Sequence, residues 1–165
     1  MARVSDEELH GLAAELGERL RARGWLLATA ESCTGGWVGE VVTALPGSSA
    51  WFERGFITYA NAAKIEMLGV APETLATFGA VSEETVAEMA KGALARSHAQ
   101  ASLAVSGIAG PGGGTRDKPV GLVCYGWALA DGRLLTSSCR LSGDRAEIRS
   151  RAVAAALRGL IELIG

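Results

Sequence analysis

The sequence predicts an α/β domain, a three-layer α/β/α sandwich whose mixed, mostly parallel sheet includes one antiparallel hairpin. Two observations carry this prediction. Short apolar runs of strand length alternate with segments whose apolar residues recur at helical spacing. Asp131-Gly132 separates two longer apolar runs, and an Asp-Gly pair there is a strong signal for a two-residue β-hairpin. At 165 residues, we expect one domain over 1–165 with its own core.

The first part of the chain is expected to alternate between helix and strand. Ser5 and Glu8 fit a capping box, after which leucine and alanine recur at helical spacing as far as Gly24. The apolar run 25–30 is of strand length. Residues 37–45 return to a helical pattern that a Pro-Gly pair ends.

The middle of the chain repeats this alternation, with a second strand expected over 54–60. Asn61 is then expected to cap a short helix that ends at Gly69. Ser82 opens the clearest helix of this region, and the run of small apolar residues at 101–109 predicts a third strand.

The hairpin strands are expected over 120–130 and 133–141. The last helix should begin after Gly143, because an apolar stripe runs from Ile148 to Leu160. Helices mixed with buried strands in this order favour a sheet with a helical layer on each side.

Composition and charge narrow the class of protein. The formal net charge is −2 and the basic residues are scattered, so neither nucleic acid nor an anionic membrane is expected as a partner. We expect a cytoplasmic protein, because the chain has neither a signal-like start nor an apolar run of bilayer length. Cys33, Cys124 and Cys139 show no spacing typical of disulfides or zinc, and we expect no metal and no cofactor.

Three loops that follow strands contain the residues best suited to chemistry. They read ESCTGG at 31–36, YANAAK at 59–64 and SGIAGPGGGT at 106–115. Because α/β domains bind ligands at the carboxyl ends of strands, we expect these loops to lie at one site. Gly35 and Gly36, at a helix start, would let a ligand approach the backbone. Equally, Ser32 or Thr34 could simply cap that helix.

Lys64 breaks a local rule, since the helix dipole disfavours a cation in a first helical turn. Burial together with the dipole would lower its pKa from about 10.4 toward neutrality, as a general base requires. The alternative is an ordinary solvated surface lysine.

The nucleophile is expected to be Ser32. His10 and His98 lie away from the three loops, so a Ser–His pair is not expected. A serine activated by Lys64, with Tyr59 nearby to relay or orient, is the remaining coherent arrangement. Cys33 is the rival nucleophile, and we favour Ser32 because no histidine is available as its partner.

The third loop fits neither known phosphate-binding fingerprint, because no Gly-Lys-Ser/Thr follows and Gly-x-Gly-x-x-Gly cannot be placed over 107–114. Its backbone amides could still form an anion nest. A flexible loop before the hairpin is the alternative.

Six motifs stand in the order found in one known family. The motifs are AESCTGG at 30–36, YANAAK at 59–64, GAVSEETV at 79–86, SGIAGPGGGT at 106–115, KPVG at 118–121 and GDRAEIR at 143–149. Over essentially the whole chain, the sequence resembles the CinA carboxy-terminal domain family in its stand-alone form. Enzymatic members of that family are nicotinamide-nucleotide amidohydrolases.

The resemblance implies a Ser–Lys amidohydrolase of pyridine nucleotide salvage, which turns nicotinamide mononucleotide into nicotinate mononucleotide and ammonia. It implies Ser32 as nucleophile, Lys64 as general base and Tyr59 as a supporting hydroxyl. It also implies the three-layer fold and a homodimer or larger homo-oligomer. The residues expected to bind substrate are Glu31, Thr34, Gly35, Gly36, Asn61, Ser106, Gly107, Gly110 and Arg145.

Two further alternatives stay open at this point. The protein could be a non-catalytic nucleotide-binding or competence-associated regulatory module, or a small interaction protein that keeps the fold. Arg145 is expected to bind the substrate phosphate, in its own or a neighbouring subunit. A surface ion pair with Asp144 or Glu147 is the alternative role for Arg145.

Overall fold

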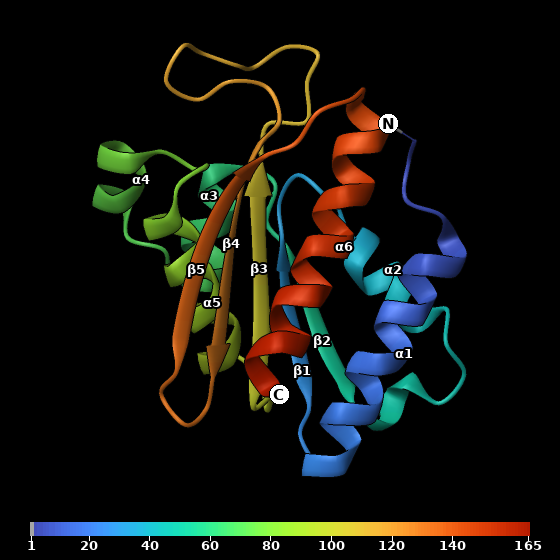
Figure 1. The fold of residues 1–165 in the computed structure, drawn as a ribbon. Helices are drawn as coiled ribbons and strands as arrows, with labels where there is room; N and C mark the ends of the chain where they lie inside the picture. The colour runs from blue at the N-terminus through green and yellow to red at the C-terminus, as the bar shows by residue number, and fades with distance from the viewer. Residues whose placement is uncertain (1) are drawn as a thin grey trace.

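A five-stranded mixed sheet forms the central layer of the structure, a computed structural model that describes residues 2–165 (Figure 1). β1 pairs in parallel with β2 and β3, whereas β4 is antiparallel to both β3 and β5, so β4 runs against the other four. The predicted mixed sheet with one hairpin is confirmed. The strands, in their order across the sheet, are β2 (Phe52–Ile57), β1 (Leu27–Glu31), β3 (Ala101–Gly107), β4 (Leu122–Leu129) and β5 (Leu134–Arg140).

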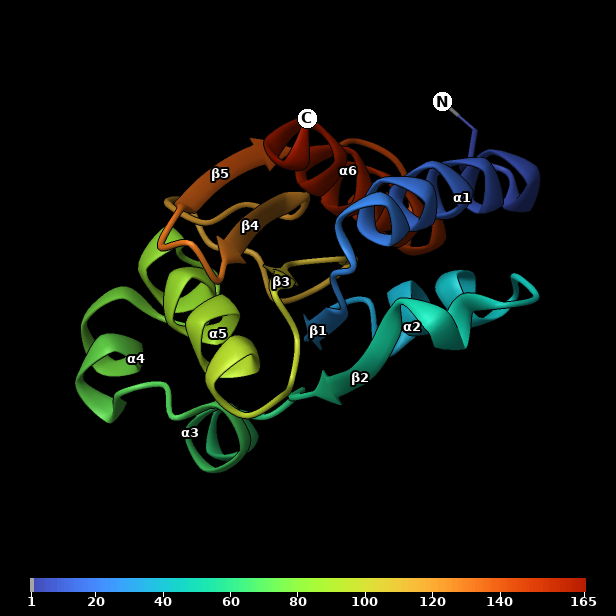
Figure 2. The same ribbon diagram turned by 90° about the horizontal axis from the view of Figure 1, so that it is seen from below.

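Helices cover both faces of the sheet, which confirms the predicted three-layer sandwich (Figure 2). One layer consists of α1 (Asp6–Arg23), α2 (Trp37–Thr43) and α6 (Arg145–Ile164). The other consists of α3 (Asn61–Leu68), α4 (Pro72–Phe78) and α5 (Glu83–Ala95). A single 3-10 turn, η1 (Ser48–Ala50), precedes β2. Within residues 2–165, no helix is both long and apolar enough to cross a membrane.

The two faces of the sheet carry side chains of different size. Toward α1 and α6 the strands present large residues such as Leu103 and Trp127, whereas toward α5 they present alanines such as Ala30 and Ala104. The small residues let α5 lie close to the sheet. A Cβ added at Gly126 would lie 2.4 Å from the carbonyl oxygen of Val86 on α5, so this contact requires glycine.

Three helix starts predicted from the sequence are confirmed by their caps. The Ser5 hydroxyl accepts a hydrogen bond from the Glu8 N–H at 3.1 Å. The Ser82 hydroxyl caps α5 in the same way. Asp144, directly after Gly143, forms a full capping box with Glu147 at the start of α6.

Other boundaries differ from the sequence prediction. α4 was not predicted, because its seven residues bury only Leu75 and so show no period. β2 starts two residues earlier than expected and ends at Ile57. Four residues, 130–133, connect the hairpin strands instead of the expected two. Gly132 adopts φ +97° and donates to the Leu129 carbonyl, and the Leu129 N–H donates to the Arg133 carbonyl at 2.9 Å.

Candidate active site

The loops that follow β1, β2 and β3 meet at one edge of the sheet, as predicted. In Figure 1 this is the upper edge, where the arrowhead of β3 ends and the loop between β3 and β4 rises above it. Backbone hydrogen bonds join the strand ends: the Ser32 N–H donates to the Val105 carbonyl at 3.0 Å, and the Thr58 N–H donates to the Glu31 carbonyl at 2.8 Å. The first and second loops therefore hold a fixed relative position.

Ser32 and Lys64 are in direct contact. The Lys64 Nζ lies 3.0 Å from the Ser32 Oγ, 2.7 Å from the Thr58 carbonyl oxygen and 3.0 Å from the Tyr59 carbonyl oxygen. Side chains of a helix lean toward its N-terminus, so a lysine in the first turn of α3 extends back over the end of β2. Lys64 is 1% exposed, which excludes the solvated surface lysine.

The hydrogen bonds of Lys64 can be made by both its charged and its neutral form. As an ammonium, Lys64 donates to the Ser32 Oγ and to both carbonyls. As a neutral amine with two N–H groups and one lone pair, it can keep both carbonyls and turn the lone pair toward the Ser32 hydroxyl. Burial lowers the pKa of Lys64 below its usual 10.5. Among residues 2–165, no carboxylate forms an ion pair with Lys64 that would offset this effect. The arrangement can therefore accept a proton from Ser32.

Cys33, the rival nucleophile, lines the same cavity as Lys64 but makes no hydrogen bond to its Nζ. Burial, with the nearby charge of Glu31, raises the pKa of the Cys33 thiol to about 12, so the thiol stays protonated near neutral pH. Its Sγ packs against the backbone of β3 at Gly107, where an added Cβ would lie 3.2 Å from the sulfur. The geometry therefore favours Ser32 over Cys33 as nucleophile.

Glu31 and Thr34, expected to bind substrate, bind the protein backbone and each other instead. Glu31 is 2% exposed. Its Oε1 accepts from the Thr34 hydroxyl at 2.6 Å and from the Val38 N–H at 2.9 Å, and its Oε2 accepts from the Gly39 N–H at 3.1 Å. Both side chains thus serve the first turn of α2, where an anion is stabilised by the free N–H groups.

Gly35, Gly36 and Asn61 lie outside the cavity that contains the Ser–Lys pair. The two glycines have positive φ angles, and a Cβ at Gly36 would meet the Ile57 side chain at 2.9 Å, so they form the turn into α2. The prediction that Asn61 caps α3 is wrong. Ala60 is the N-cap and Asn61 is the first helical residue, because the Lys64 N–H donates to the Ala60 carbonyl.

The cavity has a volume of about 270 Å³ and contains both members of the pair. Five further residues predicted from the sequence also line it: Tyr59, Ser106, Gly107, Gly110 and Arg145. Sequence reasoning missed several lining residues, namely Ala80, Val81, Ile108, Ala109, Gly112 and Gly113. These offer only backbone and apolar surface. The third-loop residues among them had been expected at the site only as part of a loop whose backbone amides could bind an anion, and Ala80 and Val81 only as part of a quoted motif.

Arg145 and Tyr59 lie together at the cavity. The Arg145 guanidinium donates to the Gly110 carbonyl at 2.8 Å and to the Tyr59 hydroxyl at 3.4 Å. The surface ion pair considered for Arg145 is not formed, since Asp144 and Glu147 engage each other in the capping box. The Tyr59 hydroxyl contacts Arg145, and it is the Tyr59 backbone carbonyl that contacts Lys64.

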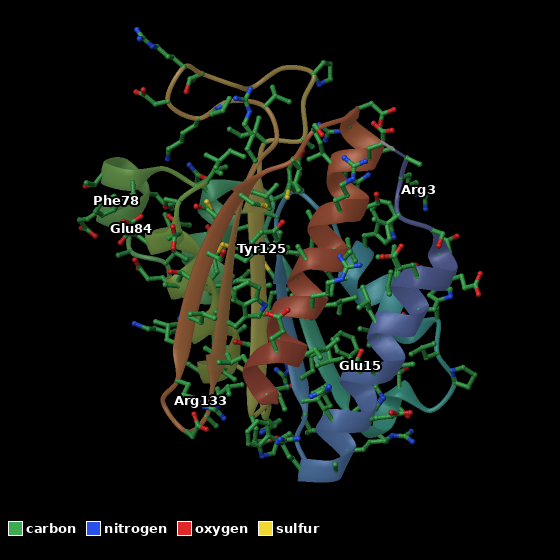
Figure 3. All side chains as sticks on the ribbon, viewed as in Figure 1. Arg3, Glu15, Phe78, Glu84, Tyr125 and Arg133 are labelled. Carbon is green, nitrogen blue, oxygen red and sulfur yellow. The ribbon has the colours of Figure 1, made fainter. Side chains whose placement is uncertain are left out.

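A second hollow of about 690 Å³ lies between α5 and β5, and residues such as Glu84 and Lys118 line it. Figure 3 shows Phe78 and Glu84 on this side, away from α6. Its one thiol, Cys124, has a pKa raised to about 11 by burial. Within residues 2–165, no group of three His, Cys, Asp or Glu side chains could hold a metal. The Ser32–Lys64 pair lies in the smaller cavity.

Comparison with known proteins places the chain in a family. Residues 9–164 match the family model described as the CinA C-terminal domain. The chain is 53% identical over 157 residues to the nicotinamide-nucleotide amidohydrolase PncC of Escherichia coli strain K12, covering 95% of each protein. It is 51% identical over 155 residues to the protein of the same name from Enterobacter agglomerans, covering 94% of each.

A solved structure agrees with these matches. The competence/damage inducible protein CihA from Agrobacterium tumefaciens superposes with a TM-score of 0.93 at 46% identity, over 99% of this chain and 98% of that one. The sequence, the fold and the arrangement of the motifs therefore lead to one conclusion: this chain belongs to the CinA C-terminal domain family.

Proposed function

We propose that this protein is a nicotinamide-nucleotide amidohydrolase, which converts nicotinamide mononucleotide into nicotinate mononucleotide and ammonia in pyridine nucleotide salvage. The observation that carries the proposal is the 3.0 Å contact between the Ser32 Oγ and the buried Lys64 Nζ. The names of the Escherichia coli and Enterobacter agglomerans relatives supply the substrate class.

In the first half of the reaction, Ser32 is acylated. The Ser32 Oγ attacks the carboxamide carbon while its proton passes to the neutral Lys64 amine. The carbon–nitrogen bond of the tetrahedral intermediate then breaks, and the leaving amino group takes the proton from the Lys64 ammonium. Ammonia departs and the nicotinoyl group is left as an ester on Ser32.

In the second half, water hydrolyses this ester. Lys64 removes a proton from the attacking water, and the carbon–Oγ bond breaks as Ser32 regains a proton from Lys64. The product leaves as a carboxylate once the acid has lost its remaining proton to the solvent, and both side chains return to their starting states. One base therefore serves both halves, and the cycle requires no other titratable residue.

The substrate phosphate is assigned to Arg145. The charge of a mononucleotide lies at the end opposite its amide, so the phosphate needs an anion site away from Ser32. Arg145 lines the same cavity, and its planar guanidinium can bind a phosphate with two parallel hydrogen bonds. The backbone amides of 107–114 offer a second, uncharged contact.

The proposal includes a cytoplasmic location and self-association. Cys33, Cys124 and Cys139 are free thiols, as is usual in a reducing compartment. β5 forms one edge of the sheet, and its Leu134 and Leu135 are 39% and 48% exposed, which supports contact with a second copy. Leu135→Asp should then lower the molar mass measured by light scattering, and an unchanged mass would place the interface elsewhere.

The function is tested by measuring ammonia release from purified protein. Nicotinamide mononucleotide should release one equivalent of ammonia for each nicotinate mononucleotide identified by mass, and Ser32→Ala should release none. Free nicotinamide and asparagine serve as amides without the nucleotide. Binding of the nucleotide by calorimetry without any ammonia release would support the non-catalytic nucleotide-binding module instead.

A further inference from the structure

A second arginine of α6, Arg149, reaches the loop that holds the nucleophile. This nucleophile loop comprises residues 32–36, between β1 and α2. The Arg149 Nε donates to the Cys33 carbonyl at 3.1 Å, and its Nη2 donates to the Thr34 carbonyl at 3.1 Å. One guanidinium therefore holds the two peptide carbonyls that follow Ser32.

The Arg149 guanidinium is itself held by an aromatic ring. It lies over the ring of Trp37, the first residue of α2, with 5.4 Å between the guanidinium carbon and the ring centroid. The guanidinium of Arg3 lies over the same ring at 4.8 Å, and Figure 3 shows Arg3 on the N-terminal segment beside the start of α6. A cation over an indole ring is attracted to it, so the stacking limits the movement of Arg149.

Glu31 holds the same loop by its other end. Glu31 directly precedes Ser32 in the chain. Its carboxylate accepts hydrogen bonds from the Thr34 hydroxyl and from two N–H groups of α2. Glu31 and Arg149 form no ion pair with each other, so each charge is directed at groups of the loop and of α2. The loop is thereby fixed by an anion that binds donors and a cation that binds carbonyls.

We propose that Arg149 is a positioning residue that sets the distance from the Ser32 Oγ to the Lys64 Nζ. The inference rests on the proposed Ser–Lys function. Arg149 does not line the cavity, so it acts through the loop and not through a contact with substrate. A displacement of about 1 Å at a reacting atom can cost on the order of 100-fold in rate, which makes such bracing worthwhile.

Reaction with a fluorophosphonate probe tests the position of Ser32 without using the nucleotide. The Ser32 Oγ forms a bond to phosphorus, fluoride leaves as the phosphorus–fluorine bond breaks, and the serine proton passes to Lys64. The labelling rate at Ser32 is followed by intact mass well below the unfolding temperature. Arg149→Lys keeps the charge but cannot bridge two carbonyls, so its labelling should be at least tenfold slower.

Arg151 supplies a matched control on the same helix. Its guanidinium also donates to two backbone carbonyls, those of Ser142 and Ala2, neither of which belongs to the nucleophile loop. Arg151→Lys should label within twofold of the wild type. A loss of less than fivefold in Arg149→Lys, or an equal loss in both variants, would overturn the positioning role. No labelling of Ser32 in the wild type would overturn the Ser–Lys function as well.

A second variant separates positioning from a loss of folding and from substrate contact. Methylguanidinium added to Arg149→Ala should restore part of the labelling rate, because it can occupy the place of the lost side chain over Trp37. In steady-state assays, Arg149→Lys should lower kcat by the same factor for the nucleotide and for its riboside, with KM changed less than threefold. Absence of rescue, or a larger loss on the nucleotide alone, contradicts the proposal.

Discussion

Glu31 and Lys64 are two buried titratable residues beside Ser32: Glu31 directly precedes it in the chain, and the Lys64 Nζ lies 3.0 Å from its Oγ. Both are almost fully buried, at 2% and 1% exposed, and each makes three hydrogen bonds. Glu31 accepts from one hydroxyl and two backbone N–H groups at the start of α2. Lys64 contacts two neutral carbonyls and the Ser32 hydroxyl.

The difference lies in what each set of partners does to the charge. The Glu31 oxygens accept from the Thr34 hydroxyl and from two free N–H groups at the start of α2, and these contacts fix the loop. Uncharged carbonyls compensate a buried ammonium only in part, and burial lowers the pKa of Lys64. A buried carboxylate whose oxygens accept from several donors therefore serves structure. A buried amine whose partners are all uncharged has a lowered pKa and is suited to proton transfer.

The largest effect is expected at the nucleophile itself. Ser32→Ala should lower kcat by at least about 10⁴-fold, because no other activated nucleophile lies beside Lys64. Cys33→Ala should retain activity within about tenfold, since its thiol is protonated and takes no part. Ammonia release under saturating nucleotide measures both variants. An inactive Cys33→Ala with an active Ser32→Ala would show that the thiol is the nucleophile.

Lys64→Arg tests the chemical side of the comparison. A guanidinium keeps the positive charge but cannot lose a proton at working pH, so kcat should fall by about 10²–10⁴-fold, the usual contribution of a general base. The wild-type pH profile of kcat/KM should rise through an apparent pKa below 10.5. An active Lys64→Arg variant with a pH-independent wild-type rate would remove Lys64 from the mechanism.

Glu31→Gln tests the structural side. The amide replaces an acceptor oxygen with a donor that faces N–H groups, so the free energy of unfolding should drop by about 1–3 kcal/mol, the cost of unsatisfied buried groups. Urea denaturation measures the loss. Glu40→Gln, on the same short helix but exposed, is the control and should change stability by less than about 0.5 kcal/mol. A Glu31→Gln variant as stable as the wild type would contradict the capping role.

Arg145→Ala asks whether this exposed cation serves substrate or fold. Loss of a phosphate contact should lower kcat/KM on nicotinamide mononucleotide by about 10–100-fold, as for a lost charge-assisted hydrogen bond. The riboside, which lacks the phosphate, should lose less than threefold. Equal losses on both substrates would assign Arg145 to holding the Gly110 loop, to which it donates at 2.8 Å.

The sequence was sufficient for the chemistry-bearing side chains and insufficient for their orientation. Ser32, Lys64 and Arg145 could be selected because each follows a predicted strand or breaks a local rule at a helix start. The fold class could be predicted because hydrophobic periodicity and helix caps are also properties of short stretches of sequence. The cap predicted at Asn61 is wrong, and the Glu31 side chain binds the start of α2. Neither could be foreseen, because a polar residue beside a strand end has the same local sequence whether it faces a cavity or the next helix. Arg149 gave no local signal, since its partners lie 115 and 116 positions away.

The smallest expected effect is a pH dependence of stability that belongs to Lys64 alone. The pKa of Lys64 in the folded state is below 10.5, its ordinary value, which the unfolded chain restores. Well below the folded pKa both states bind the proton, and the native state bears the full cost of the buried charge. Between the two values the unfolded state holds a proton that the native state has lost, so stability rises with pH, by at most about 1.4 kcal/mol per pH unit. Above 10.5 the gain is complete and the curve levels.

Lys64→Met lacks the titrating group, and subtraction of its unfolding free energies from those of the wild type cancels the other groups. The difference, from urea melts at several pH values between 6 and 11, should rise with pH over this window. Parallel curves would mean that Lys64 keeps an ordinary pKa in the folded protein, and the contrast with Glu31 would then have no electrostatic basis.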